Sequence, residues 1–123
     1  MAVVGLSHDP SRPSHVVARY LLDHGYEVIP VNPNHEKILG LKSYPDLTSI
    51  AAPVDIVNVF QRSERVPPFV EEAIAIGAKV VWMQLGIVHR EAAQTAREAG
   101  LEVVMDHCMK MEHERLFGES RGR

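Results

Sequence analysis

The sequence predicts an α/β fold in which helices cover both faces of a mostly parallel sheet of about five strands. Short apolar, β-branched runs recur along the 123 residues, and stretches with helical spacing separate them. The apolar runs contain few polar side chains, as is typical of strands buried on both faces of a parallel sheet. Together these patterns indicate a Rossmann-like three-layer fold.

The chain opens with a strand and a helix joined by a polar loop. Residues 2–6 form a short apolar run, and the segment 7–13 after it is rich in serine and proline. Residues 14–24 place apolar side chains at helical spacing. We expect Ser14 to cap the start of this helix and Gly25 to end it.

A second strand and a less regular connection follow. Residues 28–31 are strand-like, and this strand must end at Asn32 and Pro33, because proline cannot continue a strand ladder. In the connection that follows, we expect a short strand at 42–44 and a helical turn at 47–50.

The second half of the chain repeats the alternation more regularly. Its elements are expected in the order strand 54–60, helix 66–76, strand 79–83, helix 90–99, strand 102–105 and a last helix through Arg115. We therefore expect one domain over residues 1–117. The small and charged residues 118–123 predict a flexible C-terminal tail.

Composition and charge argue against several classes of protein. Hydrophobic residues make up 46% of the chain and charged residues 24%, which favours neither disorder nor a membrane protein. Met1 leads directly into an apolar strand without a basic signal region, so we expect a cytoplasmic location. The net charge of −3 speaks against nucleic-acid binding through a broad basic face. A lone cysteine, Cys108, excludes an internal disulfide and a cluster of thiolates around a metal.

The turn after the first strand has the parts of an anion-binding site. Ligands of open parallel sheets bind beyond the carboxyl ends of the strands, and this turn lies at that edge. It contributes the hydroxyls of Ser7 and Ser14, the guanidinium of Arg12 and the free backbone amides of a helix start. The alternative is that Ser14 is a helix cap and nothing more.

The same turn lacks the fingerprint of a dinucleotide site. Gly5 is its one glycine, and Asn32 stands at the end of the second strand, where an acidic residue would accept hydrogen bonds from a ribose. A nicotinamide or flavin cofactor is therefore disfavoured.

Six stretches of the sequence resemble segments of one protein family, and they occur in the same order as in that family. They are AVVGLSHDPSRPS (2–14), VIPVNP (28–33), VDIVNVF (54–60), AIGAK (75–79), WMQLGI (82–87) and CMKMEHERL (108–116). They resemble the small CoA-binding domain proteins, which are stand-alone relatives of the N-terminal domain of the succinyl-CoA synthetase alpha subunit. Members often carry a helical segment before the first strand, and here Met1 lies almost on that strand, which leaves the cover of the sheet at that edge open.

The resemblance implies a site for CoA or an acyl-CoA. The 3′-phosphorylated ADP half would lie over the first turn, and the pantetheine arm would run across the strand ends. The implied contacts are Gly5, Leu6, Ser7 and Ser14 with Arg12 for the phosphates, Asn32 and Pro33 beside the nucleotide, Val59, Phe60 and Arg62 on the adenine side, and Gln84, Leu85 and Gly86 near the arm. Lys42 would be a further cation, with a solvated loop lysine as the alternative. For Phe60 the alternative is ordinary burial at a strand end.

No catalytic constellation is apparent. The chain has no room for the second domain or the partner subunit that succinyl-CoA synthetase needs, and we expect non-catalytic binding. The histidines of the loops and helix faces, His15 among them, are expected on the surface without a metal. Cys108 is a candidate redox thiol that could form a mixed disulfide with CoA, and a buried inert thiol is the alternative.

Two other functions stay open at the level of sequence. One is an NAD(P)-binding redox protein, and the other is a regulatory or scaffold protein that has lost the ligand. The exposed edges of a five-stranded sheet would also allow a homodimer.

Overall fold

A computed structural model describes residues 1–118 of the chain, so the predicted tail lies, apart from Gly118, outside the described residues. The elements in chain order are β1 (Ala2–Val4), α1 (Pro13–Asp23), β2 (Ile29–Val31), β3 (Lys37–Ile38), β4 (Leu41–Lys42), β5 (Ile56–Val59), the 3₁₀ turn η1 (Ser63–Arg65), α2 (Val66–Ala75), β6 (Val80–Met83), α3 (Arg90–Glu98), β7 (Glu102–Val104), α4 (Met109–His113) and the π-helical turn η2 (Glu114–Gly118). No helix among residues 1–118 has both the length and the apolar composition needed to cross a membrane.

Five strands form one parallel sheet in the order β2-β1-β5-β6-β7. The predicted fold class is therefore confirmed. The chain first builds outward from β1 to β2 and then crosses back, so that β5 pairs with the other side of β1. The strand order reverses between β1 and β5, and this is where open parallel sheets bind ligands.

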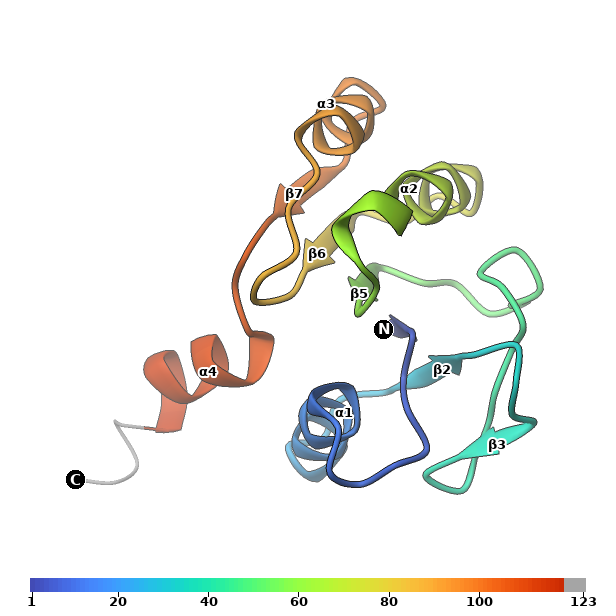
Figure 1. The fold of residues 1–123 in the computed structure, drawn as a ribbon, viewed down its shortest axis with the longest axis vertical. Coiled ribbons are helices and arrows are strands. Elements are labelled where there is room, and N and C mark those ends of the chain that lie inside the picture. Colours follow the sequence, from blue (N-terminus) through green and yellow to red (C-terminus); the bar gives the residue numbers. More distant parts are fainter. Residues whose placement is uncertain (119–123) are drawn as a thin grey trace.

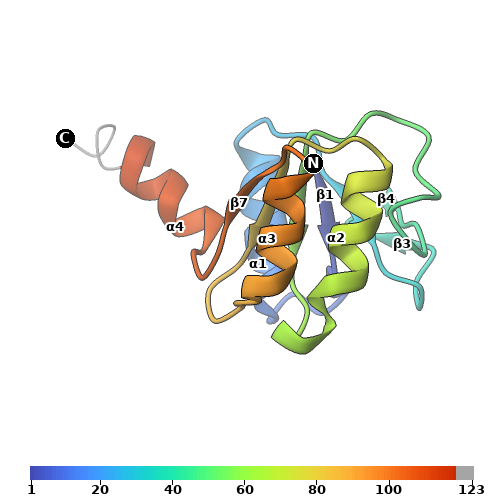
Figure 2. The ribbon, with the colours of Figure 1, turned by 90° about the horizontal axis from the view of Figure 1, so that it is seen from above.

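Helices cover both faces of the sheet. Helices α2 and α3 lie on one face, and α1 and α4 lie on the other (Figures 1 and 2). Helix α1 lies along the sheet, whereas α4 projects from the body of the domain at the far end of the molecule (Figure 2). The two faces are therefore covered unequally.

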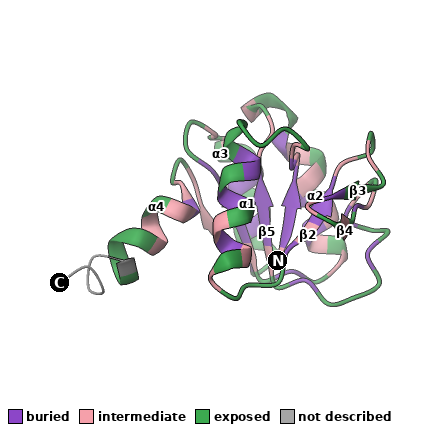
Figure 3. Ribbon diagram, turned by 90° about the horizontal axis from the view of Figure 1, so that it is seen from below, coloured by how far each residue is buried: buried purple, intermediate pink, exposed green. Residues whose placement is uncertain are grey.

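The alternation of side chains along the strands divides the core in two. In β1, Ala2 and Val4 belong to the larger cluster with α2 and α3, whereas Val3 belongs to the smaller cluster with α1. Val57 and Val59 of β5 are completely buried, and the central strands are the most buried part of the ribbon (Figure 3). Polar side chains buried in this region must be hydrogen-bonded, as Asn58 of β5 is to Gln84.

The irregular connection contains structure that the sequence did not predict. The strand expected at 42–44 is instead a small antiparallel hairpin of β3 and β4, followed by a single parallel bridge from Tyr44 to Val31. The N–H of Tyr44 donates to the Pro30 carbonyl oxygen at 3.0 Å. Pro30 is tolerated because β2 is an edge strand of the main sheet. The helical turn predicted at 47–50 is present as a turn that the bond from Ile50 N–H to Leu47 O closes at 3.1 Å.

Candidate ligand-binding site

The turn after β1 is held tightly between two neighbouring strands. The Gly5 N–H donates to the Val31 carbonyl oxygen at 3.0 Å, and the Phe60 N–H donates to the Val4 carbonyl oxygen at 2.9 Å. Gly5 has φ +81°, and a Cβ atom at this position would collide with the Phe60 carbonyl oxygen. Glycine is therefore required here both by the backbone conformation and by the close approach of β1 and β5.

The loop that follows is ordered by its own side chains. Ser7 Oγ accepts the Asp9 N–H at 3.1 Å, and Asp9 Oδ1 accepts the N–H and the hydroxyl of Ser11 at 2.9 and 2.8 Å. The Arg12 N–H donates to the Asp9 carbonyl oxygen at 3.1 Å. The hydrogen bonds from the Ser11 backbone and hydroxyl lower the pKa of Asp9, so this exposed carboxylate is charged at neutral pH.

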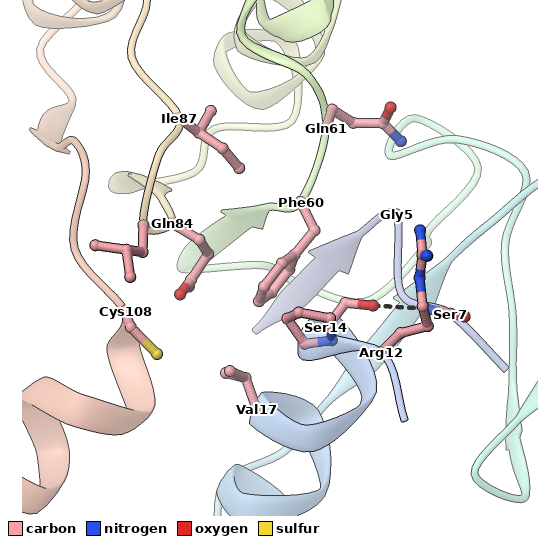
Figure 4. A pocket seen from close by; sticks show the side chains of 12 residues that line it. Gly5, Ser7, Arg12, Ser14, Val17, Phe60, Gln61, Gln84, Ile87 and Cys108 are labelled. Atoms are coloured by element: carbon pink, nitrogen blue, oxygen red, sulfur yellow. Dashed lines mark hydrogen bonds between the residues drawn. The ribbon is translucent and has the colours of Figure 1, made fainter. Parts of the chain in front are cut away.

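Ser14 holds the loop and does not cap the helix. Helix α1 begins at Pro13, and its N-cap is Arg12, so the predicted N-cap at Ser14 is wrong by two residues. Proline at the first helical position presets the helical φ and has no N–H to satisfy. Inside the helix, Ser14 Oγ is free to accept the Ser7 N–H at 2.9 Å, a bond that is drawn in Figure 4.

His15 makes a second hydrogen bond to Ser7. Its Nδ1 lies 2.9 Å from the Ser7 carbonyl oxygen, which can only accept, so this ring nitrogen carries the proton. His15 is buried, which contradicts the expectation of a surface histidine. The N–H and the carbonyl of Ser7 are thus both fixed by α1, and the loop is preorganised before any ligand arrives.

A cavity of about 390 Å³ opens beside this loop, over the ends of β1, β5 and β6. Its wall consists of Gly5, Ser7, Arg12, Pro13, Ser14, Val17, Phe60, Gln61, Gln84, Leu85, Ile87 and Cys108. Arg12 and Ser7 stand on one side, Gln84 and Cys108 on the opposite side, and the Phe60 ring lies between them (Figure 4). Segments that are 100 residues apart in sequence therefore meet in one cavity.

The two sides of the cavity differ in chemistry. Arg12 supplies a guanidinium and Ser7 keeps a hydroxyl proton to donate, whereas at the start of α1 Pro13 has no N–H and the His15 and Val16 amides already donate to the Arg12 carbonyl oxygen at 3.1 Å. The opposite side is apolar, with Val17, Ile87 and the exposed side chain of Leu85. Such a cavity suits a ligand with an anionic end and a long, weakly polar arm, and the donor set matches the phosphates of a nucleotide.

The strand-end loop on the far side is tied to the neighbouring loop. The Gly86 N–H donates to Asp106 Oδ1 at 2.6 Å, and the Asp106 N–H donates to the Ile87 carbonyl oxygen at 3.2 Å. Asp106 adopts a left-handed backbone with φ +60°, a conformation that aspartate tolerates better than most residues. Gly86 thus shapes the rim of the cavity through its backbone and is not part of the wall.

Several predicted contacts lie outside this cavity. The side chains of Leu6 and Val59 are completely buried in the core, so they could offer a ligand only backbone atoms. Asn32 and Pro33 line a second cavity of about 340 Å³ with Asn34, His35, Glu36, Ser43 and Pro45. Lys42 and Arg62 are exposed, and Lys42 Nζ lies 4.9 Å from the centre of the Tyr44 ring.

The second cavity adjoins the loop of the first. Asn32 Nδ2 donates to the Leu6 carbonyl oxygen at 3.0 Å, and the rings of His8 and His35 lie 4.2 Å apart. The loop that borders the first cavity therefore also contacts residues of the second.

Four wall residues were not among the predicted ligand contacts. Pro13, Val17, Gln61 and Ile87 were not predicted, because three of them are apolar and Gln61 is a common surface amide. Two of these positions could have been inferred from their neighbours, since Val17 lies one helical turn after Pro13 and Gln61 directly follows Phe60. Among residues 1–118, no three histidine, cysteine, aspartate or glutamate side chains are grouped so that they could hold a metal ion.

Comparison with known proteins identifies the family of this fold and site. A family model described as a CoA binding domain matches residues 1–114. The chain belongs to the CoA-binding domain family. This confirms the resemblance that six stretches of the sequence indicated.

Relatives of this CoA-binding domain include both small proteins and large ligases. It is 49% identical to the protein YneT of Bacillus subtilis (strain 168) over 113 residues, which cover 92% of this chain and 84% of YneT. A hypothetical protein from Pyrococcus horikoshii OT3 has a solved structure with a TM-score of 0.93 and 47% identity, over 95% of this chain and 82% of that one. An ADP-forming acetate–CoA ligase II of Archaeoglobus fulgidus is 33% identical over 81 residues, which cover 64% of this chain and 12% of the ligase.

Proposed function

We propose that this chain binds coenzyme A or an acyl-CoA and carries out no chemical step on it. The observation that carries the proposal is the cavity at the β1 turn, which joins phosphate-type donors on one side to an apolar wall with a thiol on the other. Coenzyme A has the same polarity, with phosphates at one end and a thiol-terminated arm at the other. The match of residues 1–114 to the CoA-binding domain family supports the assignment.

The phosphates of the ligand would lie against the loop and the start of α1. Arg12 would pair with a phosphate oxygen, while the Ser7 hydroxyl would donate a hydrogen bond. The adjoining cavity at Asn32 and Pro33 would take part of the nucleotide. Exposed Arg62 and Lys42 remain predicted outer cations, and Phe60 would pack against the adenine or the start of the arm.

The arm would run along the apolar side toward Cys108. Val17, Leu85 and Ile87 provide the apolar contacts, and Gln84 lies behind them. Arg12 and Cys108 are the ionisable side chains of the described wall, so it offers no carboxylate or imidazole as a general acid or base. This supports binding without catalysis.

Titration calorimetry with CoA, dephospho-CoA, acetyl-CoA and NAD tests the function. We expect CoA to bind more tightly than dephospho-CoA, because the latter lacks the 3′-phosphate, and NAD to bind weakly or not at all. Tighter binding of NAD than of CoA would indicate a dinucleotide protein. Absence of binding for all four would contradict the proposal and favour a scaffold.

Cys108 is expected to form a mixed disulfide with CoA. Its thiolate would attack one sulfur of CoA disulfide, the S–S bond would break, and one CoA would leave as a thiolate that takes a proton from water. Mass spectrometry after incubation with CoA disulfide should show one CoA adduct on the wild type and none on Cys108→Ser. A wild type without an adduct would show that the thiol does not lie where the end of the arm can reach it.

Asp9→Asn is expected to strengthen CoA binding severalfold. Asp9 Oδ1 accepts from Ser11, and an asparagine oxygen can accept the same bonds, so the loop should keep its shape. The substitution removes one negative charge beside a polyanion, so the affinity measured by calorimetry at low salt should rise. A matched control is Asp46→Asn, since Asp46 makes similar bonds to Thr48 and Ser49 in an exposed turn outside the cavity wall. Equal effects of both variants would exclude a local electrostatic contribution from Asp9.

A further inference from the structure

We propose that Gln84 is a positioning residue that caps helix α4 from the sheet and thereby places Cys108 in the ligand cavity. The inference deepens the proposed function, since the placed thiol would face the end of the bound arm. It rests on the hydrogen bonds of Gln84, on the missing side-chain cap at the start of α4, and on the neighbouring position of Cys108.

Gln84 makes two buried hydrogen bonds to separate parts of the chain. It directly follows β6, and only 2% of its surface is exposed. Its Nε2 donates to Asn58 Oδ1 at 3.0 Å, and its Oε1 accepts the Met109 N–H at 3.0 Å. The amide therefore joins the central strand β5 to the first residue of α4.

The start of α4 has no cap of its own. Cys108 is the N-cap residue, and its side chain makes no capping hydrogen bond. The first N–H of a helix has no partner within the helix, and leaving such a group buried without one is costly. Gln84, which directly follows β6 and is 25 residues away in sequence, supplies the missing acceptor.

Other contacts hold α4 along its side and at the loop before it. Met109 is its one buried residue, whereas Met111 is 59% exposed and the helix projects outward (Figure 3). These contacts include the bond from Trp82 Nε1 to the His107 carbonyl oxygen at 2.7 Å, the contact between Tyr20 Oη and His113 Nδ1 at 2.7 Å, and Lys110 Nζ at 5.2 Å from the centre of the Tyr20 ring. The bond from Gln84 thus fixes the point at which the chain leaves the domain.

Cys108 lies one residue before this anchored N–H. Its side chain is half-buried and lines the same cavity as Arg12. Figure 4 shows Cys108 on the same side of the cavity as Gln84. Any movement of Met109 away from Gln84 would carry the thiol with it, so Gln84 determines where the thiol stands relative to a bound ligand.

The orientation of the Gln84 amide is fixed by its other partner. Asn58 is completely buried, and its Nδ2 faces the sulfur of Met1 at 2.8 Å, which leaves Oδ1 as an acceptor that needs a donor. An amide or a protonated carboxyl group at position 84 can donate to Asn58 and accept from Met109 at the same time, whereas a carboxylate can only accept.

In the variant Gln84→Glu, the hydrogen bonds of residue 84 depend on pH. When the new carboxyl group is protonated it reproduces both hydrogen bonds, and when it ionises it loses the bond to Asn58. Trp82 is the one tryptophan of the chain and bonds to His107 just before α4, so its fluorescence reports on this segment. We expect a pH transition in the emission of Gln84→Glu that wild type and the exposed control Gln94→Glu do not show. The neighbouring ionisable residues His107, Asp106 and Cys108 are the same in all three proteins, so their effect on the emission cancels in the comparison.

Access to the thiol provides the second measurement. At a single neutral pH and without ligand, iodoacetamide should alkylate Cys108 about tenfold faster in Gln84→Met than in wild type, because the loss of a buried hydrogen bond favours local opening. Gln94→Met should match wild type. Unchanged fluorescence of folded Gln84→Glu together with unchanged alkylation of folded Gln84→Met would overturn the proposal.

Hydrogen exchange in the unmodified protein covers the case in which the variants do not fold. The Met109 amide should exchange more slowly than the other amides of residues 109–118, and fast exchange at Met109 would overturn the proposal. None of these measurements involves CoA, so their outcome is independent of whether the chain binds it.

Discussion

Replacing Gly5 with alanine is expected to lower the free energy of unfolding by about 2–4 kcal/mol. About 1 kcal/mol arises because alanine disfavours the φ of +81° at this position. The rest arises because the new methyl group would overlap the Phe60 carbonyl oxygen and lie 3.0 Å from Gln61 Nε2. Backbone atoms of β1 and β5 would have to move apart, which strains the middle of the sheet. Urea unfolding followed by circular dichroism measures the change.

Gly77→Ala is the matched control for this prediction. Gly77 has a similar φ of +75°, but a Cβ there would meet no atom within 4 Å. Its substitution should therefore cost about 1 kcal/mol, from the backbone conformation alone. If both variants lose the same stability, the close approach of β1 and β5 is not what requires glycine at position 5.

Removing the Arg12 guanidinium should weaken CoA binding by roughly 1–3 kcal/mol. Arg12 is the cation of the described cavity wall, and an arginine fork can bind two oxygens of one phosphate. Its backbone N–H bond to the Asp9 carbonyl oxygen does not depend on the side chain, so Arg12→Ala should leave the loop in place. Titration calorimetry at fixed salt gives the affinity, and urea unfolding shows that stability is kept.

Arg19→Ala and Arg12→Lys separate the causes of that loss. Arg19 pairs with Asp23 on the exposed surface of α1 at 3.5 Å, so its removal changes the net charge equally without touching the cavity. Arg12→Lys keeps the charge and loses the fork, and it should bind with intermediate affinity. An Arg12→Ala protein that binds CoA like Arg19→Ala would remove Arg12 from the site.

The order of strands and helices could be predicted because local patterns dominate there. Gly25, Gly77 and the β-branched run at 56–59 mark ends and strands without help from tertiary contacts. The β3–β4 hairpin could not be predicted, since its strands are two residues long and depend on pairing with each other. The start of α1 was misplaced because Pro13 begins the helix while Ser14 serves a tertiary contact with Ser7.

Part of the cavity wall follows from the predicted topology. Arg12, Ser7 and Phe60 line one cavity, because strand ends of a parallel sheet share an edge, and their contact with a ligand stays a prediction. The sequence could not distinguish Leu6, whose side chain points into the core, from a wall residue. It also could not show that His15 is buried against a loop carbonyl, since neither burial nor partner follows from a lone histidine.

The cavity also bears on how the domain is made. Its wall includes residues from Gly5 to Cys108, so it cannot form until the chain has left the ribosome through Cys108. A ligand that needs this complete wall cannot stabilise the first strand and helix alone, and it gains affinity only for the finished fold. CoA should therefore act on the last step of folding, and the cellular lifetime of the domain would rise with the supply of its ligand.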